Sequence, residues 1–140
     1  MSREAVVQEA ISWEGTPHMH EARVKGAGID CGTFLLEVFE RCGVIEHTEV
    51  EHLPHDFHMH RSEEVYLRHV EQWAHRIEED PLPGDLVLYR IGRCISHGAI
   101  VVSWPTIIHA HVGKGVILDD ATANAYLAEH QVGFWRINGW

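Results

Sequence analysis

The 140-residue sequence is poor in cysteine and in basic side chains, and it contains no long apolar run. Its three cysteines, Cys31, Cys42 and Cys94, are too few and odd in number for a disulfide framework. No stretch reaches the roughly 20 apolar residues that a membrane-spanning helix requires. Eleven Lys and Arg against 21 Asp and Glu give a formal net charge of −10. This balance argues against nucleic acid and anionic membranes as partners.

We expect no secretory leader, because MSREAVVQEAISW shows no basic start followed by an apolar run. We therefore expect a protein that is cytoplasmic as synthesised. With 45% hydrophobic and 23% charged residues, a chain of this length predicts one globular domain over residues 1–140.

Hydrophobic periodicity divides the chain into a helical first half and a strand-rich second half. Helices are predicted over residues 3–13, 30–42, 62–79 and 120–129. Strands are predicted over residues 85–91, 97–103, 107–112, 116–118 and 134–137. Helices followed by consecutive strands indicate an α+β fold, in which N-terminal helices pack on a central antiparallel sheet.

Cys31 opens the second predicted helix, directly after a glycine-rich turn. Asp30 is the predicted N-cap and Gly43 the predicted stop signal. A thiol in the first turn of a helix lies beside unpaired N–H groups at the positive end of the helix dipole. Such a position lowers the pKa of the thiol and makes it a candidate nucleophile. The alternative is a small buried cysteine without chemistry, which is how we interpret Cys42 on the same helix.

Histidines follow the alternation of two predicted strands. His97 shares one face of its strand with Ala99, and His109 and His111 share one face of the next strand. If the two strands form a hairpin, His97 lies beside His109 or His111, and the sequence leaves the register open. Packing of the cysteine helix on this sheet would bring Cys31 to His97. A nucleophile, a base and a group that orients the base are the parts of a thiol hydrolase.

Four sequence blocks strengthen this interpretation: GTPHMHEARVKGAGIDC, PGDLVLYR, SHGAIVV and IIHAH, in this order. They resemble the NlpC-type family of papain-like bacterial cell-wall peptidases, and within it the short branch associated with phage tails and prophages. The resemblance runs from about Ile11 to Val116. It implies a papain-like fold, no cofactor, and hydrolysis of peptidoglycan stem peptides, typically between D-glutamate and a diamino acid.

The resemblance also implies roles for individual residues. Cys31 matches the nucleophile, His97 the base and His109 the third polar residue, which gives a Cys-His-His triad. Asp30 matches the acidic residue that helps to hold the free amino end of the stem peptide.

Two positions depart from the family pattern. Gly32 stands where the family usually has serine, and His18 stands where it usually has tyrosine. Both positions belong to the substrate side of the site, and His18 is the candidate for a second oxyanion donor.

We expect no wall-binding module beside the predicted domain. The peptidoglycan stem peptide is therefore the expected substrate, and other phage tail proteins are the expected partners that would bring the enzyme to it. The protein would then be virion-associated or delivered to the cell wall. The alternatives are a catalytically inactive tail or assembly component, and another thiol amidase or acyltransferase on the same fold.

Thirteen histidines raise the question of a metal site. The densest group comprises His52, His55, His58 and His60, around Pro54. This stretch falls between predicted helices and offers no rigid scaffold for ligands. We therefore predict an exposed loop there and no metal site.

Overall fold

The computed structural model of the chain describes residues 2–49 and 64–140. Its elements, in chain order, are α1 (Arg3–Ile11), β1 (Arg23–Val24), β2 (Gly28–Ile29), α2 (Cys31–Arg41), α4 (Val65–Val70), β3 (Ala74–Ile77), β4 (Leu86–Ile91), β5 (Cys94–Ser103), β6 (Thr106–His111), β7 (Gly115–Asp120), α5 (Ala125–His130) and β8 (Gln131–Ile137). Among these helices, none combines the length and the apolar character needed to cross a membrane.

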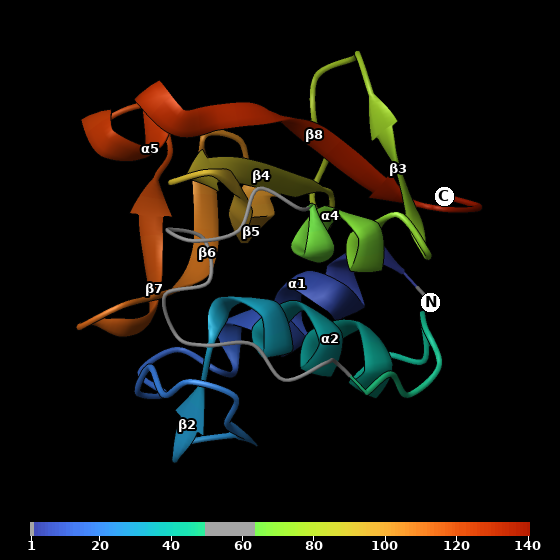
Figure 1. Cartoon of the computed structure of the whole chain (residues 1–140). Helices are drawn as coiled ribbons and strands as arrows, with labels where there is room; N and C mark the ends of the chain where they lie inside the picture. The colour runs from blue at the N-terminus through green and yellow to red at the C-terminus, as the bar shows by residue number, and fades with distance from the viewer. Residues whose placement is uncertain (1, 50–63) are drawn as a thin grey trace.

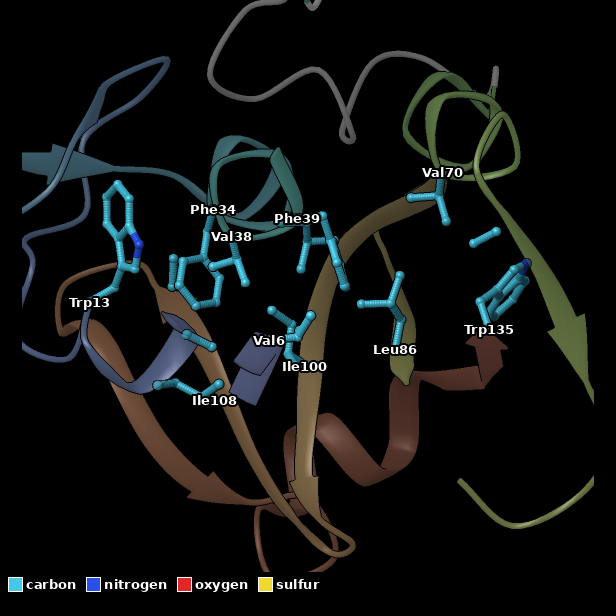
Figure 2. Packing of buried hydrophobic residues seen from close by; sticks show 14 of the residues in the cluster. Val6, Trp13, Phe34, Val38, Phe39, Val70, Leu86, Ile100, Ile108 and Trp135 are labelled. Carbon is cyan, nitrogen blue, oxygen red and sulfur yellow. The ribbon is translucent and has the colours of Figure 1, made fainter. Parts of the chain in front are cut away.

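Six strands form one sheet in the order β3-β8-β4-β5-β6-β7, with every neighbouring pair antiparallel. Helices α1 and α2 lie together on one side of this sheet (Figure 1). Figure 2 shows Phe34, Val38 and Phe39 pointing from α2 toward the sheet, where they join Ile100 and Ile108 in the main core. The predicted α+β fold, with N-terminal helices on an antiparallel sheet, is confirmed.

The start of α2 is held by a reciprocal capping box. The Asp30 carboxylate accepts a hydrogen bond from the Thr33 N–H at 2.9 Å, and the Asp30 N–H donates to the Thr33 hydroxyl at 3.0 Å. Such an N-cap contributes about 1 kcal/mol to stability. Gly43 follows the helix with a φ of 70°, the left-handed conformation that ends helices. The predicted N-cap and stop signal are both confirmed, and Cys31 is the first helical residue.

The predicted helix over residues 62–79 is wrong in its second half. The structure ends α4 at Val70 and begins strand β3 at Ala74, while residues 62 and 63 lie outside the described part. Ala74 pairs with Ile137 and Ile77 with Phe134 along β8. The sheet edge therefore supplies hydrogen bonds that override the helical periodicity of this segment.

The last predicted helix begins later than expected. Asp120 still belongs to β7, and α5 starts at Ala125 with Asn124 as its N-cap. Strands β1 and β2, which form a separate two-stranded sheet ahead of α2, were not predicted. Strands β4 to β8 lie where the sequence predicts them, with end points that differ by a few residues.

Candidate active site

The Cys31 thiol lies at the start of α2, over the beginning of strand β5. Its Sγ donates a hydrogen bond to the carbonyl oxygen of Ser96 at 3.3 Å. Ser96 directly precedes His97, and Cys31, Ser96 and His97 line one cavity of about 230 Å³. The register between β4 and β5 shifts at this point, from Tyr89↔His97 to Arg90↔Ile95, so Ser96 is an inserted residue of a β-bulge. The helix and the bulge together bring Cys31 next to the residue that precedes His97.

The surroundings of Cys31 keep its thiol protonated. Burial raises the pKa of the thiol, the Asp30 carboxylate raises it further, and the backbone N–H groups of Cys31 and Gly32 only partly oppose the rise. The hydrogen bond to the Ser96 carbonyl acts in the same direction, because it requires the proton on sulfur. The lowered pKa that the sequence predicts is therefore wrong for this structure. The helix N-terminus is present, but desolvation and a neighbouring carboxylate outweigh it.

His109 is the hydrogen-bonded partner of His97. The Nε2 of His97 lies 2.8 Å from the Nδ1 of His109. The pair Ile100↔Ile108 sets the register of β5 against β6, so His97 and His109 are diagonal neighbours on one face of the sheet. His111 instead donates from Nδ1 to the carbonyl of Val112 at 2.6 Å. The choice between His109 and His111, which the sequence leaves open, is decided by these side-chain contacts: His97 bonds to His109, and His111 turns to the backbone of Val112.

Asp119 extends this pair into a row of three side chains. Its Oδ2 lies 3.1 Å from His109 Nε2, and Asn124 donates to the same oxygen at 3.0 Å. The N–H of Asp120 donates to Asp119 Oδ1 at 2.9 Å. Sequence reasoning missed Asp119. The only signal was that Asp119 shares a face of its strand with Ile117, two residues earlier. This signal has a meaning only when the register is known, because Ile117 lies opposite His109.

Both histidines of the row are held neutral near pH 7. Burial lowers the pKa of His97 well below its usual value, and the neighbouring charge of His109 would lower it further. Burial also lowers the pKa of His109, although Asp119 opposes that shift. For Asp119, hydrogen bonds from Asn124 and His109 outweigh burial and lower the pKa of its carboxyl group. A neutral His97 can accept a proton, which is the state a general base requires.

Tyr66 is a second site residue that sequence reasoning missed. It lies on α4, lines the same cavity, and its hydroxyl donates to the carbonyl of Cys31 at 3.5 Å. A Cβ atom at Gly98 would lie 2.7 Å from this hydroxyl oxygen, so the glycine makes room for the tyrosine on the sheet. The sequence offered no signal, because Tyr66 falls on the apolar stripe of a predicted helix.

The three residues predicted to lie near the substrate, His18, Asp30 and Gly32, all line the cavity that contains Cys31. The carboxylate of Asp30 is also a structural element. One oxygen caps α2, and the other accepts a hydrogen bond from the Glu21 N–H at 2.6 Å. Asp30 therefore ties the turn before β1 to the helix that carries the nucleophile.

The histidine-rich stretch from 52 to 60 lies outside the described residues. Within residues 2–49 and 64–140, no group of three or more His, Cys, Asp or Glu side chains is placed to hold a metal ion.

The NlpC/P60 family matches residues 11–136 of the chain. The chain belongs to the NlpC/P60 family. Peptidoglycan hydrolases are among the members of this family, as the SagA domain described below shows. The family that the four sequence blocks predict is confirmed, and the papain-like fold with it. No curated protein matches this NlpC/P60 chain.

Solved structures show the same fold at low sequence identity. The NlpC/p60 domain of the peptidoglycan hydrolase SagA superposes with a TM-score of 0.64 at 19% identity, covering 96% of this chain and 97% of that one. An NlpC/P60 family protein from Bacillus cereus gives a TM-score of 0.68 at 17% identity, covering 98% of this chain but 40% of that one. A third structure is RipD from Mycobacterium tuberculosis, described as a non-catalytic NlpC/p60 domain protein adapted to peptidoglycan binding. It superposes with a TM-score of 0.60 at 11% identity, covering 99% of this chain and 97% of that one.

Proposed function

We propose that this NlpC/P60 chain is a cysteine peptidase that hydrolyses amide bonds in peptidoglycan stem peptides, of the D-glutamyl–diamino acid endopeptidase type. Cys31 is the nucleophile, His97 the base, and His109 orients His97. The observation that carries the proposal is that Cys31 and His97 line one cavity while the Nε2 of His97 is occupied by His109. Nδ1 is then the nitrogen of His97 that takes the thiol proton.

The reaction begins when the thiol leaves the Ser96 carbonyl and passes its proton to His97 Nδ1. The thiolate attacks the amide carbonyl of the stem peptide and forms a tetrahedral oxyanion. His97 returns the proton to the departing amine, and water then hydrolyses the thioester. Because the resting thiol is protonated, binding of the substrate in the cavity initiates the chemistry, and no preformed ion pair is needed.

The oxyanion requires at least two donors in a place shielded from water. The Cys31 N–H at the start of α2 is one of them. His18 and Tyr66 both line the cavity and are the two candidates for the second donor. The hydroxyl of Tyr66 already lies at the backbone of Cys31, which favours Tyr66 as the second donor.

The remaining assignments rest on the sequence resemblance. Asp30 and Gly32 border the substrate beside the nucleophile, and Asp30 supplies the negative charge that attracts the free amine of the stem peptide. The association with phage or prophage tail proteins, and delivery to the cell wall by them, is proposed on the order of the four sequence blocks.

Incubation with purified peptidoglycan and with a synthetic stem tetrapeptide tests the activity, with products identified by mass spectrometry. The expected product carries a new amine on the diamino acid, and the variant Cys31→Ala, with the same circular dichroism spectrum, forms none. Product formation by Cys31→Ala at the wild-type rate would remove the thiol mechanism. Release of a fatty acyl group, or of ammonia from a side-chain amide, would instead identify an acyltransferase or amidase.

A non-catalytic, peptidoglycan-binding role is the second candidate. The raised pKa of Cys31 and its hydrogen bond to Ser96 favour it, and so does the structural similarity to RipD. Under this alternative, which includes an inactive tail component, the protein sediments with insoluble peptidoglycan but releases no peptide. Binding and hydrolysis are separate readouts of the same incubation.

A further inference from the structure

Three side chains from three adjacent strands form a hydrogen-bonded row: His97 on β5, His109 on β6 and Asp119 on β7. Each is the diagonal neighbour of the next on one face of the sheet, given the pairs Ile100↔Ile108 and His109↔Ile117. The row ends on the carboxylate of Asp119. This carboxylate determines which nitrogen of each histidine carries the proton. We infer that Asp119 is a positioning residue that fixes the tautomers of both histidines and leaves the Nδ1 of His97 unprotonated.

The assignment follows from counting donors. An ionised carboxylate only accepts hydrogen bonds, so the proton between Asp119 and His109 belongs to His109 Nε2. A neutral imidazole carries one N–H, so His109 Nδ1 has a lone pair and accepts. The 2.8 Å contact then requires His97 to donate from Nε2. His97 in turn has its lone pair on Nδ1, where the thiol proton is to be received.

Without the carboxylate, the row has two equivalent arrangements. His109 could carry its proton on Nδ1 and donate it to His97 Nε2. His97 would then carry its own proton on Nδ1 and could not act as a base there. Asp119 excludes this second arrangement, although two hydrogen bonds separate it from His97. Its negative charge also stabilises the positive charge on His97 after the proton transfer.

Asp119 is itself held in place from two sides. Asn124, the N-cap of α5, donates to Oδ2, the oxygen that faces His109. The backbone N–H of Asp120 donates to the other oxygen. The junction between β7 and α5 therefore aims the carboxylate at His109, and it links a helix on the far side of the sheet to the base of the active site.

Other polar groups surround the row without replacing this anchor. The ring of Tyr89 packs at 5.8 Å from that of His97, and the ring of His111 at 5.6 Å from that of His109. A charge on His111 would disfavour protonation of either histidine, a charge on His18 would disfavour protonation of His97, and Lys114 disfavours protonation of His109. Asp119 supplies the carboxylate that counters them.

Long-range proton–nitrogen NMR spectra of the full chain, labelled with ¹⁵N, test the tautomers in the absence of any substrate. In the wild type both histidines should show protonated Nε2 and a lone pair on Nδ1. The variant Asp119→Ala should convert His97, in part or fully, to the form protonated on Nδ1, and Asp119→Glu should restore the original form. Asp120→Asn is the matched control, because that neighbouring carboxylate contacts neither histidine.

A wild-type spectrum with the proton of His97 on Nδ1 would overturn the inference, and this measurement needs no variant to fold. Unchanged tautomers in a folded Asp119→Ala protein would overturn it as well. The kinetic consequence rests on the proposed function: kcat on the stem tetrapeptide should fall roughly 10²-fold in Asp119→Ala, with KM nearly unchanged. If the wild type hydrolyses nothing, the proposed function fails while the NMR assignment can still hold.

Discussion

The Sγ of Cys31 lies 3.3 Å from the carbonyl oxygen of Ser96, the residue next to His97. The candidate nucleophile is therefore held as a neutral thiol, one peptide unit away from its candidate base. In this arrangement, activation of the thiol depends on what enters the cavity, because the resting structure stabilises the protonated sulfur.

The alkylation rate of Cys31 by iodoacetamide should rise with pH through an apparent pKa above the ordinary value of about 8.5. The cause is burial of the thiol, reinforced by the Asp30 carboxylate. Mass spectrometry of the modified peptide measures the rate, and Cys31→Ser reports any labelling of Cys42 or Cys94. A midpoint well below 8.5 would show a thiolate–imidazolium pair and contradict this resting state.

Substitution of Tyr66 by Phe should reduce kcat on stem peptides by about 10²- to 10³-fold, the effect of removing one oxyanion donor. The ring stays in place against Gly32 and Gly98, so the thermal unfolding temperature should change little. The comparison variant is His18→Ala, because His18 lines the same cavity. A large loss in His18→Ala with no loss in Tyr66→Phe would assign the second donor to His18 instead.

Two glycines beside Tyr66 should respond differently to the same substitution. A Cβ at Gly98 would lie 2.7 Å from the Tyr66 hydroxyl and 2.9 Å from Leu88 Cδ2, so Gly98→Ala should cost about 1–3 kcal/mol of unfolding free energy. A Cβ at Gly32 would meet Tyr66 at an ordinary 3.6 Å. Gly32→Ala should therefore be neutral or slightly stabilising, since glycine is a poor helix former. Urea titrations measure both values, and equal costs would argue against the close packing of Tyr66 on Gly98.

Acid should destabilise the fold through His97 and His109. Both have a lowered pKa in the folded protein, so below about pH 6.5 the unfolded chain binds more protons than the folded one. Their contribution to stability is present above about pH 6.5 and is lost as the pH falls toward the pKa values of the folded protein. Each histidine then costs about 1.4 kcal/mol of unfolding free energy per pH unit. Urea unfolding between pH 7.5 and 5 should show that the unfolding free energy of His97→Gln falls less steeply with pH than that of the wild type. Identical slopes would mean that His97 titrates normally.

Asp30 should prove to have both a structural and a substrate-binding role. Asp30→Ala removes the cap of α2 and should cost about 1 kcal/mol, whereas Asp30→Ser retains a capping hydroxyl and should cost less. If the carboxylate attracts the amine of the stem peptide, Asp30→Ser should nevertheless raise KM. An unchanged KM in a stable Asp30→Ser protein would leave Asp30 with the structural role alone.

Much of the helical layer could be predicted because its signals are local. Asp30, Cys31 and Gly43 mark the start and end of α2 within a few residues, and the apolar spacing between them identifies the buried face. The segment around Ala74 could not be predicted in this way. Its helical periodicity is real, but pairing with β8, more than fifty residues further along the chain, decides its structure.

By itself, the sequence determined the family, the α+β layout, and the alternation that puts His97 and His109 on the faces of neighbouring strands, because residue type and short-range spacing suffice for these. Only the tertiary structure decided that His109 and not His111 partners His97, that Asp119 anchors the row, that Tyr66 reaches the nucleophile, and that the thiol of Cys31 is protonated. Strand register, burial and the charges packed around a group depend on segments far apart in the chain, and no local pattern contains them.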